Sequence, residues 1–261
     1  MSPLKALHCP DEPWHWTTPT ECAACEHPCF GSHEWVNVIW GETFTDEDHY
    51  HNDPMTISVT ETLGCLRMAY YKRTQDYAES PERMLARVMG THNHRLPEKH
   101  NPEGSEITFA HPLSDGFSLK GTADVSLPGI IRDYKGVDRP TKTLGGGVRE
   151  DEDGQKLHVN ALQLSVYADL KELAGEEEVH TLEIVQVARK AIKAHESYRV
   201  PQALGWAISR AEALISVLNG DLLLSSLKFE GIRIKYYRVN QCSFCPFEGQ
   251  CRQEGGDECN A

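Results

Sequence analysis

Residues 121–135 read GTADVSLPGIIRDYK. Two apolar runs flank a Pro-Gly pair, a pattern that predicts two β-strands joined by a tight turn. Because side chains alternate along a strand, Asp133 and Lys135 share one face, and the turn brings Asp124 near Asp133. Two carboxylates beside an ammonium group suit a hard cation such as Mg²⁺ or Mn²⁺. A cation held there would activate a water and neutralise charge on a phosphate, so the stretch indicates phosphodiester hydrolysis. An Asp-x-Lys triplet also occurs on ordinary surface hairpins.

The sequence around this hairpin predicts a mixed α/β fold, with a central mixed sheet flanked by helices. The hairpin closes a β-meander, and helical periodicity lies on either side of it. Residues 138–156 are rich in Gly, Asp and Glu, which predicts a mobile loop or a long hairpin. The expected strands are 56–60, 107–111, 117–126, 130–137 and 181–188, and the expected helices are 61–72, 81–97, 159–173 and 202–218.

The chain has 261 residues, which suits one substantial domain and a small appendage. We expect residues 1–54, rich in Cys, His and Trp, to form a metal-stapled N-terminal module, and residues 55–261 to form the main domain. The formal net charge of −13 excludes a surface that is basic overall, so any phosphate binding must be local. No run reaches the roughly 20 apolar residues that cross a bilayer, and residues 1–10 lack a signal-peptide pattern. We therefore expect a cytoplasmic protein without membrane contacts.

Three further side chains are candidates for the same site. Gln163 and Tyr167 are spaced i, i+4, so they lie on one face of the helix expected at 159–173. An amide beside an aromatic ring could hold a nucleotide or its phosphate, or could form a polar seam against the sheet. His94, near the end of the helix expected at 81–97, could supply a nitrogen ligand, although a single histidine there is often structural.

Nine cysteines in a chain expected to be cytosolic favour metal binding over disulfides. A set of four thiols is compact enough for one centre if the isolated cysteine joins the C-terminal trio, and it suits either a 4Fe–4S cluster or zinc: Cys65, Cys242, Cys245 and Cys251. A second set near the N-terminus could bind zinc, or could stay as free thiols or pair differently: Cys9, Cys22, Cys25 and Cys29. Cys259 is left over.

Taken in order, these motifs resemble the PD-(D/E)xK nucleases of the RecB type that carry an iron–sulfur cluster. The similarity is greatest to the CRISPR-associated protein four exonucleases and related phage proteins, and it runs from about residue 55 to residue 251. The resemblance implies a restriction-endonuclease-like core and a structural 4Fe–4S cluster on the first set of four cysteines. It also implies a divalent cation held by His94, Asp124 and Asp133, with Lys135 as the catalytic lysine and Gln163 and Tyr167 in the family's QxxxY motif.

Two features depart from the family pattern. Asp133 stands where many relatives have glutamate, and His92 competes with His94 as the ligand. The resemblance implies an exonuclease that degrades single-stranded DNA, often from 5′ to 3′, and that forms homo-oligomers or works with CRISPR or recombination partners. One alternative is an endonuclease or end-trimming factor in CRISPR adaptation or recombination. Another is a non-catalytic nucleic-acid-binding protein that metal centres stabilise.

Overall fold

The computed structural model describes residues 4–9, 15–25, 53–81, 83–86, 88–90, 99, 103–137, 139–144, 148–150, 156–188, 190–227 and 245–254. The chain divides into two compact units. The first comprises Met1–Pro54 and Tyr71–His92, and the second comprises Met55–Tyr70 and Asn93–Ala261. Tyr71–His92, which the sequence analysis assigned to the main domain, joins the first unit because one of its strands pairs with the N-terminal strand.

The first unit contains a small three-stranded sheet and a short helix. Strand β1 (Leu4–His8) lies between β2 (Trp16–Thr17), which is antiparallel to it, and β4 (Tyr77–Glu79), which is parallel. Helix α1 (Pro19–Ala24) follows a capping box in which Thr18 and Glu21 bond to each other's backbone N–H groups. These elements were not predicted, because they are too short to show a strand or helix period.

The second unit is built on a six-stranded mixed sheet with the strand order β11-β10-β7-β6-β3, and β5 pairs with the free side of β6. The meander β5-β6-β7 is antiparallel, as predicted, and β10 joins β7 in parallel. The strands are β3 (Thr56–Ser58), β5 (Ser105–Pro112), β6 (Ser118–Leu127), β7 (Ile130–Gly136), β10 (Thr181–Ala188) and β11 (Ala191–Glu196).

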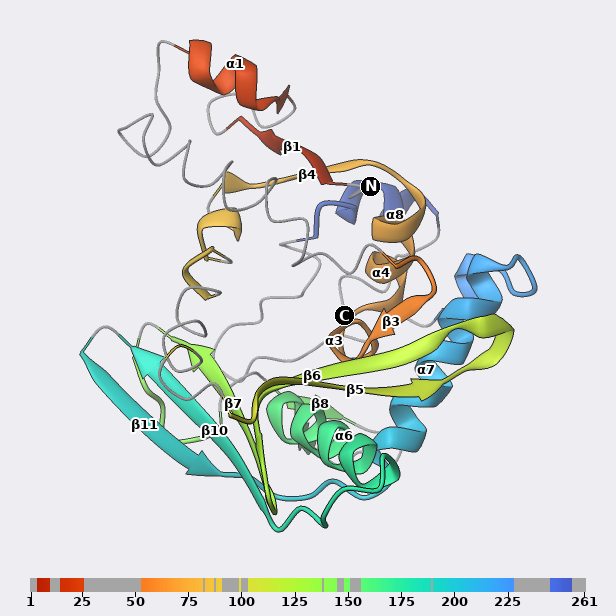
Figure 1. Ribbon diagram of the computed structural model, residues 1–261. Coiled ribbons are helices and arrows are strands. Elements are labelled where there is room, and N and C mark those ends of the chain that lie inside the picture. The colour runs from red at the N-terminus through yellow and green to blue at the C-terminus, as the bar shows by residue number, and fades with distance from the viewer. Residues whose placement is uncertain are drawn as a thin grey trace. The chain divides into compact units, whose positions relative to one another are not determined.

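One edge of β6 is shared by two different strands. Near its start, β6 pairs with β3 through Ser118–Lys120, and near its end it pairs with β7 through Val125–Leu127. The last register pair with β7 joins Val125 to Arg132, and beyond it β7 pairs with β10 alone. Figure 1 shows the result: β5 and β6 extend away from β7, β10 and β11. The segment between the two pairings is where the candidate site lies.

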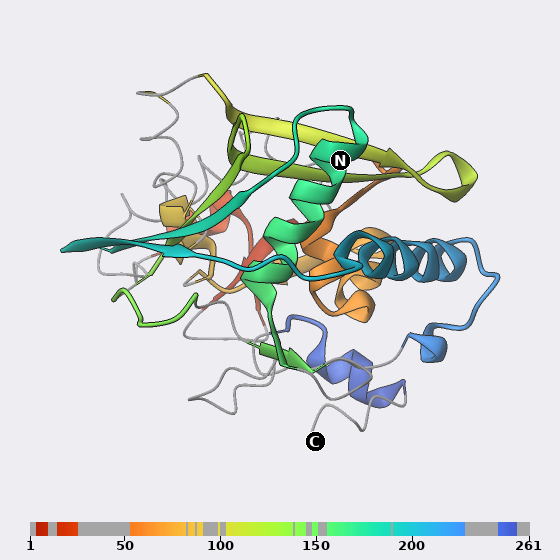
Figure 2. The ribbon, with the colours of Figure 1, turned by 90° about the horizontal axis from the view of Figure 1, so that it is seen from below.

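Helix α6 (Val159–Leu173) packs on this sheet, helix α7 (Ala203–Leu218) packs against α6, and both helices were predicted. The views in Figures 1 and 2 agree in placing α7 beside α6, which contacts β5, β6, β7 and β10. Helix α6 is buried almost all round, and Leu164, Val166 and Ala168 are fully inaccessible. A helix that is buried on nearly every side belongs in the core, and α6 is the helix against which the sheet packs. It ends before Gly175, whose φ of +83° suits a helix C-terminus.

The helix expected at 61–72 is instead two helices, α3 (Val59–Leu63) and α4 (Leu66–Thr74). A capping box between Ser58 and Glu61 starts α3 two residues earlier than predicted. Gly64 ends α3, with its N–H donating to the Thr60 and Glu61 carbonyls, and this break leaves Cys65 between the helices. The periodic pattern hid the break because both helices bury apolar residues.

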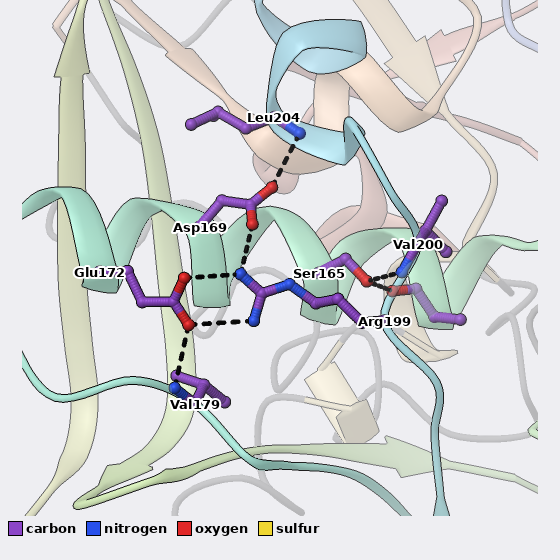
Figure 3. A network of polar contacts seen from close by, with 8 residues as sticks. Ser165, Asp169, Glu172, Val179, Arg199, Val200 and Leu204 are labelled. Atoms are coloured by element: carbon purple, nitrogen blue, oxygen red, sulfur yellow. Dashed lines mark hydrogen bonds and ion pairs between the residues drawn. The ribbon is translucent and has the colours of Figure 1, made fainter.

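An ion-pair network attaches the segment between β11 and α7 to helix α6 (Figure 3). The Arg199 guanidinium binds both carboxylate oxygens of Glu172 at 3.2 and 2.9 Å, and it also contacts Asp169. Asp169 in turn accepts the Leu204 N–H at 3.1 Å in the first turn of α7. Ser165 accepts the Val200 N–H at 2.8 Å. These contacts fix the start of α7 relative to α6.

The remaining described elements are short. Residues 148–150 and 156–158 form the antiparallel pair β8 (Val148–Glu150) and β9 (Lys156–His158), so the region expected as a loop or hairpin contains a hairpin. Residues 81–90 are helical wherever they are described, and helix α8 (Glu248–Gln253) lies near the C-terminus. Strand β11 was missed. Among the helices that the structure describes, none is long and apolar enough to cross a membrane.

Candidate active site

Asp133 and Lys135 lie on the same face of β7, with one residue between them. Asp133 is only 3% exposed, and its Oδ2 lies 2.7 Å from the Nζ of Lys135. The side chain of Lys135 is 30% exposed. A carboxylate this deeply buried needs a charged or hydrogen-bonding partner, because desolvation of an isolated charge is costly. Lys135 supplies that partner and also extends from the core toward solvent.

Asp124 lies on β6 where the strand separates from β7. Its Oδ2 accepts the backbone N–H of Tyr134 at 2.6 Å. Tyr134 follows Asp133 beyond the last β6–β7 register pair, so on this edge its N–H lacks a partner from the β6 backbone. The Asp124 carboxylate therefore replaces a sheet hydrogen bond, and that contact ties it to the residue that follows Asp133.

Gln163 and Tyr167, one turn apart on α6, complete this cluster. The Gln163 Oε1 accepts from Lys135 Nζ at 3.2 Å, and its Nε2 donates to the Tyr167 hydroxyl at 2.7 Å and to Asp133 Oδ1 at 3.4 Å. Gln163 and Tyr167 are 7% and 3% exposed. The amide thus contacts the ammonium, the carboxylate and the phenol, and it fixes the orientation of all three. Gln163 therefore packs against the sheet and at the same time bonds to both candidate residues of β7.

Gly121 explains how Tyr167 reaches the sheet. A Cβ atom at this position would lie 2.6 Å from the Tyr167 Cε1 and 3.0 Å from the Val59 Cγ2. The distance to the Tyr167 ring is shorter than real Cβ contacts, and the distance to Val59 is tight, so a side chain at position 121 would displace the ring.

Lys171 was not singled out in the sequence, yet it is among the most buried side chains, at 2% exposure. Its Nζ donates to the Ser126 Oγ at 3.0 Å and to the Leu127 carbonyl at 2.6 Å, and it lies 3.7 Å from Glu176. Gly121 and Ser126 both meet α6 although they are five positions apart, and the alternation of burial along β6 ends in two consecutive buried residues, Val125 and Ser126. Lys171 thereby anchors the hairpin that carries both aspartates.

The charges of the cluster set the protonation of its members. Burial lowers the pKa of Lys135, but the Asp133 carboxylate, with a smaller effect from Asp124, raises it by more, so the pKa lies above its usual value. Burial, followed by the negative charge of Asp133, raises the pKa of Tyr167 well above its usual value. Lys135 is therefore a cation and Tyr167 a neutral phenol at neutral pH.

The donor set suits a hard divalent cation. Two carboxylates, Asp124 and Asp133, act on the same ammonium group, and oxygen ligands of this kind are those that Mg²⁺ and Mn²⁺ prefer. No group of three or more His, Cys, Asp or Glu that could hold a metal occurs within the part of the chain that the structure describes. The predicted third ligand, His94, and its competitor His92 lie outside the described residues.

Two of the four cysteines expected to share a cluster lie close to each other. Cys65, between α3 and α4, and Cys251, on α8, are 9% and 6% exposed and interact electrostatically. Burial raises the pKa of the Cys65 thiol, and Cys251 adds to this effect. The Arg67 Nη1 lies 3.7 Å from the Cys251 sulfur, and its Nε donates to the Leu227 carbonyl at 3.0 Å.

The other two members of this set are placed differently. Cys245 is half-buried just before α8, where its carbonyl accepts the Glu248 N–H at 3.2 Å, six positions before Cys251. Cys242 lies outside the described residues. Cys65 and Cys251, far apart in the sequence, thus lie buried in the same unit, and Arg67, two residues after Cys65, contacts the Cys251 sulfur.

The N-terminal cysteines all belong to the first unit. Cys9 follows β1 and donates its N–H to the His15 carbonyl at 3.0 Å, and Cys22 and Cys25 lie on and at the end of α1. All three are half-buried, and Cys29 lies outside the described residues, as does Cys259. Within the described ranges these thiols are not part of a group of three potential ligands.

The fold is similar to that of solved structures. The crystal structure of SSO0001 matches with a TM-score of 0.53 and 16% identity, over 85% of this chain and 98% of that one. A putative exonuclease from Eubacterium rectale matches with a TM-score of 0.44 and 15% identity, over 67% of this chain and 87% of that one. No family model and no curated protein matches the chain. The similarity to SSO0001 shows a shared fold, and the function has to be argued from the site.

Proposed function

We propose that this chain is a metal-dependent deoxyribonuclease with a PD-(D/E)xK core, which hydrolyses phosphodiester bonds as an exonuclease on single-stranded DNA. The observation that carries this proposal is the convergence of Asp133, Lys135 and Gln163, with Asp124 fixed beside them by its bond to Tyr134. A buried carboxylate and an ammonium group that bond to the same amide are costly to fold, and together with Asp124 they supply the groups that phosphoryl chemistry needs. The motif order and its resemblance to RecB-type nucleases add the substrate class.

Each residue of the site has a role that follows from its chemistry. Asp124 and Asp133, with His94 as the expected third ligand, would hold Mg²⁺ or Mn²⁺. The bound cation would lower the pKa of a water and offset charge on the phosphate. Lys135, cationic at neutral pH, would orient the attacking water and stabilise negative charge as the bond breaks. Gln163 bonds to both Lys135 and Asp133 and so fixes their relative positions. The Tyr167 hydroxyl accepts from the same amide and orients it.

We also propose that a structural 4Fe–4S cluster is bound by Cys65, Cys242, Cys245 and Cys251. The proximity of Cys65 to Cys251 supports it, because these residues are far apart in sequence and are buried together beside Arg67. A zinc ion on Cys9, Cys22, Cys25 and Cys29 is a separate proposal that rests on residue type and spacing. The 5′ to 3′ direction, homo-oligomers and CRISPR or recombination partners are supported by the resemblance of the motifs.

The nuclease proposal is tested with single-stranded DNA labelled at either end, incubated with the purified protein and Mn²⁺ or Mg²⁺. We expect short labelled products that accumulate from one end and that EDTA prevents. Lys135→Ala and Asp133→Asn should each slow cleavage by at least about 100-fold. Lys120→Ala, which removes a lysine from the same sheet on the face opposite α6, should cleave like the wild type.

Three outcomes would change the proposal. Full activity of both active-site variants would show that the site is elsewhere. Internal fragments in place of end-labelled products would favour an endonuclease. Binding without cleavage under any divalent cation would favour a non-catalytic nucleic-acid-binding protein.

The metal centres are tested by purification without oxygen, followed by iron, sulfide and zinc analysis. We expect a brown protein with broad absorption toward the blue, in which Cys65→Ser and Cys251→Ser remove most of the iron and Cys22→Ser removes zinc alone. A colourless wild-type protein that contains zinc and no iron would rule out the cluster.

A further inference from the structure

A line of polar residues leads across the sheet from Lys135 to its edge. In the strand register Lys135 on β7 lies opposite Gln186 on β10, and Gln186 lies opposite Lys193 on the edge strand β11. Residues that lie opposite each other in a sheet point to the same face, and neighbouring strands are about 4.8 Å apart. Lys193 is therefore about 10 Å from Lys135 between backbones, on the face where Gln163 contacts the lysine.

The loop of residues 139–144 is fastened over this line. Gln186, only 1% exposed, accepts the Thr141 N–H at 2.7 Å and donates to the Thr143 carbonyl at 2.9 Å. Lys193 donates to the Thr141 carbonyl at 3.1 Å. Asn160, in the first turn of α6, donates to the Leu144 carbonyl at 2.9 Å. The loop thus has anchors on two strands and on the helix that carries Gln163, so its position beside the active site is fixed.

The loop and the turn end of the adjacent hairpin, residues 186–195, are basic in an acidic protein. Arg139 and Lys142 on the loop, and Lys190 and Lys193 on the β10–β11 hairpin, are all exposed. We call these four residues the basic rim. The sequence contains no Asp or Glu in residues 139–144 or 186–195, although the chain as a whole carries a net charge of −13. Edge strands often carry a lysine to prevent sheet association, but that accounts for Lys193 alone.

We propose that the basic rim binds the phosphate backbone of the DNA strand outside the active site. This inference rests on the proposed function and names the path that the substrate takes. A polyanion is the partner that four exposed cations favour, and a nuclease with an acidic surface needs a local attraction for its substrate. Because the loop is held in place, its cations do not have to be ordered on binding. We expect the strand to extend from Lys135 along the outside of this loop toward β11.

The test measures affinity for single-stranded oligonucleotides of about 4 and about 24 nucleotides, in EDTA so that no cleavage occurs. The double variant Lys142→Gln/Lys190→Gln removes two rim charges and spares Lys193, which supports the loop. We expect roughly 3-fold to 10-fold weaker binding of the long oligonucleotide at low salt, a smaller loss for the short one, and a salt slope reduced by about 0.7 for each lost contact. The control is Lys120→Gln, which removes one lysine charge from the opposite face of the sheet.

The possible results separate the two proposals. In one result, the double variant binds the long oligonucleotide as tightly as Lys120→Gln does, while the wild type binds and cleaves DNA. This result would overturn the proposal that the basic rim binds DNA and would leave the nuclease proposal standing. If both variants lose the same affinity for the oligonucleotide, the effect comes from the overall charge of the protein, and the proposal that the basic rim binds DNA is also overturned. A wild type that neither binds nor cleaves either oligonucleotide overturns both. Thermal unfolding of each variant at the wild-type temperature verifies that the fold is intact.

Discussion

The Asp124 carboxylate lies 2.6 Å from the backbone nitrogen of Tyr134 and accepts its N–H where strands β6 and β7 part. A single side chain thereby has two roles: it satisfies a backbone donor that the sheet leaves unpaired on this edge, and it holds a negative charge beside Asp133. Substitutions that separate hydrogen bonding from charge should separate stability from activity.

Asp124→Asn keeps an acceptor oxygen for the Tyr134 N–H but removes the charge, whereas Asp124→Ala removes both. We expect the asparagine variant to unfold in urea within about 0.5 kcal/mol of the wild type. The alanine variant should lose about 1–3 kcal/mol, because it leaves a backbone donor without its partner. Both should fail to cleave DNA. Equal stability of the two variants would contradict the structural role of this carboxylate.

Gly121→Ala should destabilise the protein by about 1–3 kcal/mol, because the added methyl group overlaps the buried Tyr167 ring. Gly205→Ala on α7 is the matched control. A Cβ there meets nothing within 4 Å, and alanine favours a helix, so this variant should gain about 0.5–1 kcal/mol. Urea unfolding of both variants measures the difference. A Gly121→Ala protein as stable as its control would show that the ring does not lie against β6.

Lys171→Met should lose about 1–3 kcal/mol of unfolding free energy, because the Leu127 carbonyl and the Ser126 hydroxyl lose a buried donor. Lys142→Met makes the same change on an exposed loop and should stay within about 0.5 kcal/mol of the wild type. Chemical denaturation provides the comparison. If both substitutions have the same small effect, Lys171 does not anchor the hairpin.

The ion pair of Glu172 with Arg199 predicts a pH-dependent stability (Figure 3). Burial raises the pKa of Glu172, but the hydrogen bonds from Arg199 and Val179 lower it by more, so its folded-state pKa lies below the unfolded value of about 4.3. The folded state then binds fewer protons than the unfolded state between these two values. The pair therefore stabilises the protein above about pH 4.3, and the benefit is lost as the pH falls through the folded-state pKa.

A double-mutant cycle of Glu172→Gln and Arg199→Gln isolates this contribution. We expect a coupling free energy of about 1 kcal/mol at pH 7, which declines toward zero in acid below the folded-state pKa. A coupling that is unchanged at low pH would assign the effect to packing of the side chains and not to charge.

The sequence by itself determined the elements with strong local periods. Helix α6 and strand β10 were predicted with their observed ends, 159–173 and 181–188, because each has a continuous apolar pattern between clear breaks. The hairpin that carries Asp124, Asp133 and Lys135 was also evident from its Pro-Gly turn. Strand β11 was missed because it is an exposed edge strand whose residues, AIKAHE, do not alternate with burial.

Only the tertiary structure decided which distant residues meet. The separation of β6 from β7, the burial of Lys171, the contact of Gln163 with Lys135 and the loop fastened by Gln186 all join segments more than 25 positions apart or depend on strand register. Local periodicity reports which face of an element is buried, whereas contacts between elements depend on where the packed layers place those faces. Residue types therefore suggested the chemistry, and packing determined which groups share one site.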